Sequence, residues 1–169
     1  MEEETRARWE GKVIAELKGP TPDQVWPLLA DFCNLHKWLP TLDTCYRVEG
    51  VPGQPGLVRY AAGTANGKGS DPPKLKWVNE RLLMTDPSDK CFSYEVLDNN
   101  LGFKSYVATI RVMPINDGGD GKMVGCTIEL SFVSDPVDGW GLQDMRSFLD
   151  FRLQAVAKNI GSAIQEASE

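Results

Sequence analysis

The stretch 140–164, WGLQDMRSFLDFRLQAVAKNIGSAI, decides the fold of this chain. Its apolar residues recur every three or four positions, at Met145, Phe148, Leu149, Leu153, Val156, Ala157, Ile160, Ala163 and Ile164. This spacing places them on one wide stripe of an α-helix. The opposite side carries mostly polar residues, namely Gln143, Asp144, Arg146, Gln154, Lys158 and Gln165. The sequence therefore predicts one long C-terminal helix with a broad apolar face.

Most of the chain before this helix alternates apolar and polar residues with a period of two, which is typical of half-buried β-strands. Turn residues divide it into seven expected strands, over 9–18, 44–49, 57–62, 74–85, 91–97, 102–113 and 123–133. Two short helices are expected after the first strand. One begins with Thr21 as N-cap and Pro22 at its first position, and the other is capped by Asp31 and stopped by Pro40. We expect a single α+β domain over 1–169, with the sheet curled around the long helix and a pocket between them.

Composition narrows the functional class. The 169 residues carry a formal charge of −6 and have a pI near 4.9, which disfavours a nucleic-acid partner because phosphate binding needs a basic face. No apolar stretch approaches membrane-spanning length, and the first residues lack the apolar core of a signal peptide, so we expect a cytoplasmic protein without membrane insertion. Four scattered cysteines and the single His36 predict no metal site, and no cofactor fingerprint is present.

Strand parity predicts which side chains point into the pocket. Four inward rows are expected: Val78, Glu80, Leu82 and Met84; Phe92, Tyr94 and Val96; Tyr106, Ala108, Ile110 and Val112; and Val124, Cys126, Ile128, Leu130 and Phe132. Glu80 is thus a carboxylate on an otherwise apolar row. The strand over 57–62 stays ambiguous, because the face with Arg59 and the face with Tyr60 are equally apolar around these two residues.

Several local motifs carry a resemblance to a known family. They are the block Asp31–Pro40 (DFCNLHKWLP), Val58-Arg59-Tyr60, Trp77-Val78-Asn79-Glu80 and Tyr106-Val107-Ala108-Thr109. Together they resemble the lachrymatory factor synthases of onion and their plant relatives. These belong to the helix-grip superfamily of steroid-transfer domains, birch-pollen-type allergens and polyketide cyclases. The resemblance runs from Trp9 onward. It implies a seven-stranded curved antiparallel sheet around the C-terminal helix, two short helices at one end, and an internal cavity.

The resemblance also implies a candidate active site. The family's arginine, glutamate and tyrosine match Arg59, Glu80 and Tyr106, and the reaction is a proton-transfer rearrangement of an alkenyl sulfenic acid to a thial S-oxide. In this reading Glu80 shuttles the proton, Arg59 holds the polar head of the substrate and Tyr106 orients it. An apolar cavity raises the pKa of a carboxyl group and a neighbouring guanidinium lowers it again, a combination that suits acid–base work near neutral pH.

The expected partner is a small hydrophobic ligand in the cavity. Its predicted contacts are Trp38, Val78, Leu82, Tyr94, Ile110, Ile128, Leu149 and Leu153. The Gly-rich segment 63–73 reads as a mobile loop at the cavity mouth. It lacks the acidic run of the synthases, a difference that bears on the choice of substrate.

Two functions from different classes stay open. One is an isomerase of the lachrymatory factor synthase type, and the other is a non-catalytic carrier or sensor of a lipid, hormone or phenolic. The gate and latch motifs of abscisic acid receptors are absent, which disfavours a hormone receptor of that kind. An interaction module that uses the outer sheet face ranks last, because the alternating charged residues there are typical of a solvated surface.

Overall fold

The computed structural model describes residues 8–65, 74–117, 119 and 121–168. The elements follow in the order β1 (Trp9–Lys18), α1 (Pro22–Leu29), a 3₁₀ helix η2 (Phe32–Lys37), β2 (Thr44–Glu49), β3 (Val58–Ala65), β4 (Lys74–Asp86), β5 (Cys91–Asn99), β6 (Val107–Asn116), β7 (Met123–Ser134) and α2 (Leu142–Ser168).

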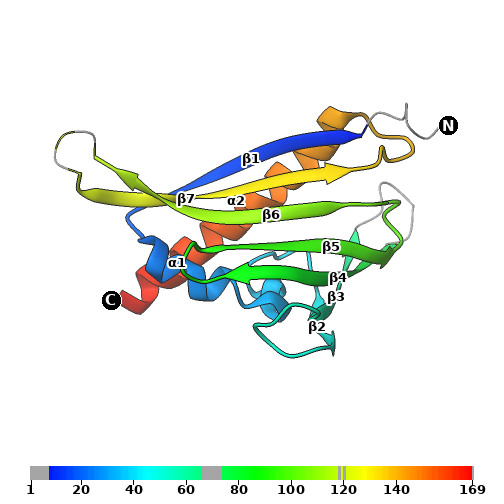
Figure 1. Cartoon of the computed structure of the whole chain (residues 1–169), viewed down its shortest axis with the longest axis horizontal. Coiled ribbons are helices and arrows are strands. Elements are labelled where there is room, and N and C mark those ends of the chain that lie inside the picture. The colour runs from blue at the N-terminus through cyan, green and yellow to red at the C-terminus, as the bar shows by residue number, and fades with distance from the viewer. Residues whose placement is uncertain (1–7, 66–73, 118, 120, 169) are drawn as a thin grey trace.

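The seven strands form one antiparallel sheet in the order β1-β7-β6-β5-β4-β3-β2. From β2 to β7 each strand pairs with the next one in the sequence. The first strand, β1, pairs with β7 and forms the sheet edge opposite β2. Figure 1 shows α2 crossing one side of this sheet obliquely, from the β1–β7 edge to α1 near the C-terminus. The predicted α+β architecture, a curved sheet around a long C-terminal helix with short helices after the first strand, is confirmed.

The core lies between the inner sheet face and α2. The helix buries the predicted apolar stripe, with Met145, Leu149, Leu153, Val156, Ala157 and Ile160 all at most 5% exposed. On the sheet side, the core consists of the inward-facing side chains of β1, β5, β6 and β7. Since each of these side chains leaves water on folding, the packing of α2 against the sheet contributes hydrophobic stabilisation.

The short helices differ in how they begin. At α1 the backbone N–H of Gln24 donates to Thr21 Oγ1 (3.2 Å), and the Gln24 side-chain oxygen accepts from the Thr21 N–H (2.9 Å). This reciprocal capping box confirms Thr21 as the N-cap. Asp31 is the N-cap of η2 as predicted, but its carboxylate makes no capping hydrogen bond and accepts instead from the side-chain amide of Asn34 (2.7 Å).

The sixth strand begins at Val107 and not at residue 102 as predicted. The Asn99 side chain explains the difference: its oxygen accepts from the N–H groups of Leu101 and Phe103, and its amide donates to the Phe103 carbonyl. Gly102 (φ +85°) and Ser105 (φ +54°) then take left-handed conformations that a strand does not accommodate. The segment 100–106 is therefore a loop, and Tyr106 stands at its end.

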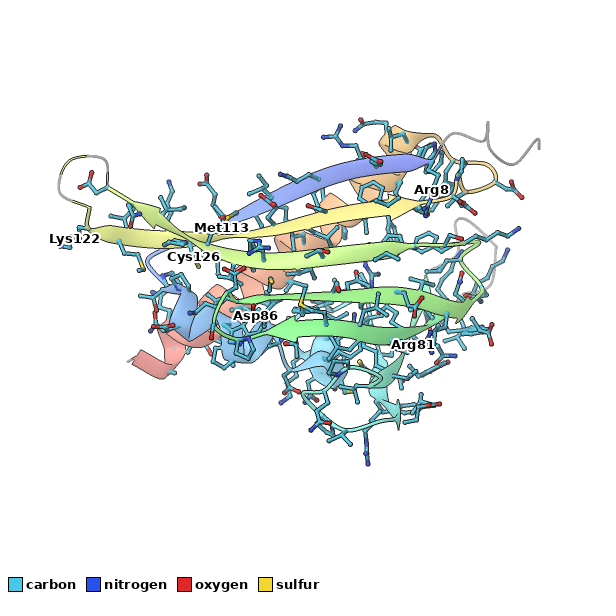
Figure 2. The ribbon with its side chains drawn as sticks, in the orientation of Figure 1. Arg8, Arg81, Asp86, Met113, Lys122 and Cys126 are labelled. Carbon is cyan, nitrogen blue, oxygen red and sulfur yellow. The ribbon has the colours of Figure 1, made fainter. Side chains whose placement is uncertain are left out.

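Two residues predicted to point inward are exposed. Met84 is turned out because the β4–β5 register shifts between Leu82 and Met84, which changes the face of every residue beyond the shift. Val124 lies in the β6–β7 hairpin, which extends past the other strands with Lys122 near its tip (Figure 2). At that distance from α2 an inward face has nothing to pack against.

The predicted loop over 63–73 begins later than expected, since Gly63, Thr64 and Ala65 continue β3. Residues 66–73 lie outside the described part of the chain. Gly63 has a steric role: a Cβ there would stand 1.9 Å from the Thr41 carbonyl oxygen, which belongs to the backbone and cannot easily move away. A side chain at position 63 is therefore excluded.

We predict that Gly63→Ala lowers the free energy of unfolding by about 2 kcal/mol or more, because overpacking against backbone forces β3 or residue 41 to shift. Gly161→Ala is the matched control. Its new Cβ would meet Leu17 Cδ2 at an ordinary 3.7 Å, and alanine in a helix interior should raise stability by about 0.5–1 kcal/mol. Urea denaturation of both variants measures these changes in the free energy of unfolding. An unchanged stability in Gly63→Ala would contradict the close approach of Thr41.

Candidate functional site

A cavity of about 80 Å³ lies between the inner face of β3–β7, the η2 region and the middle of α2. Its wall is mostly apolar and aromatic, interrupted by four charged residues: Asp31, Arg59, Glu80 and Arg152. A water needs roughly 10–15 Å³ of such space, so the cavity has room for several waters or one small molecule. Pockets for drug-sized ligands are typically about 300–1,000 Å³, and the ligand that fits here is correspondingly small.

Arg59 and Glu80 form a buried ion pair on the cavity wall. They are direct partners across β3 and β4, which settles the ambiguous parity of the third strand in favour of the Arg59 face. Arg59 Nε and Nη2 lie 2.8 Å and 2.7 Å from the same carboxylate oxygen, Glu80 Oε1. The residues are only 5% and 8% exposed. In this low-dielectric setting the contact is a strong charge-assisted pair.

The rest of the Arg59 guanidinium is also held by the protein. Its Nη1 donates to the Phe32 carbonyl (2.7 Å), and its Cζ lies 3.8 Å from the centre of the Phe32 ring. Burial opposes the charge, but attraction to Glu80 outweighs it and the pKa of the guanidinium is raised. Arg59 is therefore a fixed cation that ties η2 to the sheet.

The two carboxylate oxygens of Glu80 differ in their contacts. Both guanidinium contacts reach Oε1, while Oε2 makes no hydrogen bond or ion pair within the described part of the chain. Glu80 is on the cavity wall, so this second oxygen is available to a molecule inside. A carboxylate with one oxygen anchored and the other unpartnered has a defined direction in which it can accept or donate a proton.

Two tyrosines complete the polar part of the cavity. The hydroxyl oxygens of Tyr94 and Tyr106 lie 3.4 Å apart. Burial raises the pKa of Tyr94 to about 12 and that of Tyr106 well above its ordinary value. Tyr106 is 1% exposed, and its ring stacks between those of Phe103 and Phe132. Both hydroxyls thus stay protonated at neutral pH and can donate hydrogen bonds.

The structure thus brings Arg59, Glu80 and Tyr106, the three residues of the predicted active site, to one cavity. Six of the predicted ligand contacts also line it: Trp38, Val78, Tyr94, Ile110, Leu149 and Leu153. The other two, Leu82 and Ile128, are buried in the core and are not part of the cavity wall. Which of these residues touch a ligand stays a prediction.

Arg152 is a charged cavity residue that the sequence analysis did not identify. It lies on α2, one turn from Phe148, Leu149 and Val156, and so interrupts the apolar stripe. A charged residue at an apolar-stripe position is the signal that could have found it. Burial lowers the pKa of its guanidinium, an effect that Glu80 and the two tyrosines partly offset.

Among the residues that the structure describes, no group of three or more histidine, cysteine, aspartate or glutamate side chains is placed to hold a metal ion. All four cysteines are free thiols, and burial raises the pKa of Cys126 to about 11. Within the described ranges, no helix is both long enough and apolar enough to cross a membrane.

A curved sheet around one helix, with a few polar side chains on the wall of a mostly apolar cavity, defines a ligand-binding helix-grip protein. The family model "Polyketide cyclase / dehydrase and lipid transport" matches residues 14–165, and the chain belongs to this family. The family description indicates a hydrophobic ligand, which agrees with the mostly apolar wall of the cavity.

Two solved structures from bacilli have the same fold. The protein XoxI of Bacillus cereus is 20% identical with a TM-score of 0.68, over 95% of this chain and 99% of its own. A putative uncharacterized protein of Bacillus thuringiensis is 21% identical with a TM-score of 0.63, over 89% of this chain and 98% of its own. At this identity the similarity shows the fold and not the reaction.

We predict that Arg59→Met lowers the free energy of unfolding by about 3–5 kcal/mol, because it leaves the Glu80 carboxylate buried without its cation. The double variant Arg59→Met/Glu80→Gln should recover part of the loss. The matched control is the outer pair Arg81–Glu95, which has a 2.6 Å contact but side chains 45% and 27% exposed. Arg81→Met should cost no more than about 1 kcal/mol. Equal losses in urea denaturation at the two pairs would contradict a buried pair.

We also predict a loss of stability at alkaline pH that depends on Tyr94. The pKa of a tyrosine is about 10 in the unfolded chain, and burial raises that of Tyr94 to about 12. The stabilisation is therefore fully present below the unfolded value and is lost as the pH rises through the folded one. The urea midpoint of the wild type should fall across this window more steeply than that of Tyr94→Phe, and equal slopes would refute the shift.

Proposed function

We propose that this protein is an isomerase of the lachrymatory factor synthase type, which binds a small alkenyl sulfenic acid in the cavity and moves one proton within it. The proposal rests on the difference between the two carboxylate oxygens of Glu80. Arg59 holds Oε1, whereas Oε2 has no partner among the described residues and belongs to a side chain of the cavity wall. The volume of about 80 Å³ supports a substrate of this size. The family membership supports a hydrophobic ligand and leaves the reaction to be tested.

The proposed reaction needs no co-reactant. Glu80 Oε2 takes the proton from the sulfenic acid O–H and returns it to the alkenyl carbon farther from sulfur. The O–H bond breaks, a C–H bond forms, and the double bond moves from carbon–carbon to carbon–sulfur. General acid–base catalysis of this kind requires one group that can hold the proton between the two positions.

The other residues have supporting roles in the proposal. Three of the five N–H groups of Arg59 are used by Glu80 and the Phe32 carbonyl, so two remain for the polar head of the substrate. The Tyr106 hydroxyl donates a hydrogen bond to the oxygen of this polar head, because its raised pKa keeps the hydroxyl neutral. The surrounding apolar wall limits water, which strengthens each of these interactions.

A non-catalytic carrier or sensor is the second candidate. It is favoured by the structural role of Arg59, which ties η2, β3 and β4 together whether or not a substrate is present. The small cavity suits a phenolic or a short apolar compound better than a long-chain lipid. A carrier should bind several such compounds with similar affinity and convert none of them.

The test is an assay with an alkenyl sulfenic acid generated in situ. We expect the wild type to form the thial S-oxide, and Glu80→Gln to lose about 10²–10⁴-fold in rate, the usual worth of a general acid–base group. Glu95→Gln is the control, because it removes a carboxylate from a similar Arg–Glu pair on the outer face between β4 and β5. Its rate should equal that of the wild type.

Full activity in a folded Glu80→Gln variant would refute the mechanism. Absence of product with the wild type would refute the isomerase and favour the carrier.

A further inference from the structure

The cavity contains two arginines in opposite situations. Arg59 is bonded to a carboxylate and to a backbone carbonyl. Arg152 makes no hydrogen bond or ion pair anywhere in the described residues, and its one specific contact is the ring of Phe148, whose centre lies 5.0 Å from its Cζ. A cation–π contact compensates only part of the cost of removing a guanidinium from water.

The charges around the cavity are unevenly paired. Arg59 and Glu80 neutralise each other through direct contacts. The remaining acid, Asp31, is exposed to solvent and accepts a hydrogen bond from the Asn34 side-chain amide, with no ion pair to Arg152. Arginine stays protonated in proteins, so Arg152 is a cavity cation without a contacting counter-charge, and Glu80 attracts it only through space.

The surroundings of Arg152 suit a negatively charged oxygen. The hydroxyls of Tyr94 and Tyr106 line the same cavity as this guanidinium, whose charge opposes part of the rise that burial causes in the pKa of both. A planar guanidinium with its fork of N–H groups free, in one cavity with two hydroxyl donors, provides the groups with which proteins bind carboxylates. The other charged groups of α2, such as Arg146 and Lys158, lie on its exposed face.

We propose that the cavity holds a small organic monoanion and that Arg152 is the residue that binds its charged oxygen. The ligand class is a short apolar chain that ends in an anionic oxygen group, either a carboxylate or the sulfenate that forms when Glu80 takes the proton of the proposed substrate. This deepens the proposed function and rests on the same cavity, but it depends on Arg152 and not on proton transfer by Glu80.

The test compares two probes of the same length, hexanoate and hexanamide, by NMR titration of the full chain. We expect wild-type protein to bind hexanoate at least about tenfold more tightly than hexanamide, a difference equivalent to about 1.4 kcal/mol. Arg152→Met should remove this preference and leave hexanamide affinity within about twofold of the wild type. Arg146→Met makes the same substitution on the exposed face of α2 and should keep the preference.

Equal binding of the two probes by the wild type, or a preference that survives in Arg152→Met, would overturn the proposal. Thermal unfolding without ligand gives an independent reading. Removing an unpaired cation from the cavity should leave the Tm of Arg152→Met equal to that of the wild type or higher. A marked fall would mean that Arg152 serves the fold, and would also overturn the proposal.

The isomerase assay separates this inference from the proposed function. Preferential binding of hexanoate without turnover of the sulfenic acid supports the anion site and refutes the isomerase. Turnover of the sulfenic acid without a preference for hexanoate supports the isomerase and refutes the anion site. If both hold, a reduced rate in Arg152→Met assigns the sulfenate as the anion, and an unchanged rate assigns a carboxylate ligand.

Discussion

Two opposite charges inside an apolar wall can persist only if each compensates the other, and the contact of Arg59 with Glu80 meets this requirement. The pair joins adjacent strands of the sheet and, through the Phe32 carbonyl, fixes the 3₁₀ helix that covers one end. It also keeps polar atoms where packed side chains would otherwise be favoured. The polar part of the cavity wall at β3 and β4 follows from this one contact.

The aromatic residues set the shape of the space that remains. Rings from β5, β7, the loop before β6 and the start of α2 touch one another in a continuous series that includes Phe92, Tyr94, Tyr106, Phe103 and Phe148. Rings of this size have few rotamers, so the wall is stiff compared with one made of aliphatic chains. A small, rigid cavity of this kind discriminates by size and by the position of a polar group.

Hydrophobic period alone predicted most of the fold, because the stripe of α2 and the alternation of the strands are strong local patterns. Glu80 was also visible, as the one carboxylate on an apolar row. Arg59 was not, since both faces of β3 are buried and parity could not choose between them; the family resemblance selected it. Arg152 escaped notice because a long cation on a helix stripe usually reaches solvent. The register shift before Met84 and the loop set by Asn99 depend on contacts that a periodic pattern does not contain.

The loop position of Tyr106 has an evolutionary consequence. Its carbonyl accepts from the N–H of Val96 (3.0 Å), so Tyr106 lies where the turn that Asn99 organises meets the β5–β6 ladder. Changes in the turn can therefore alter the cavity wall next to this hydroxyl while every strand keeps its register. A fold built in this way can acquire new ligands through short insertions or substitutions in one surface segment, with its sheet and its long helix inherited unchanged.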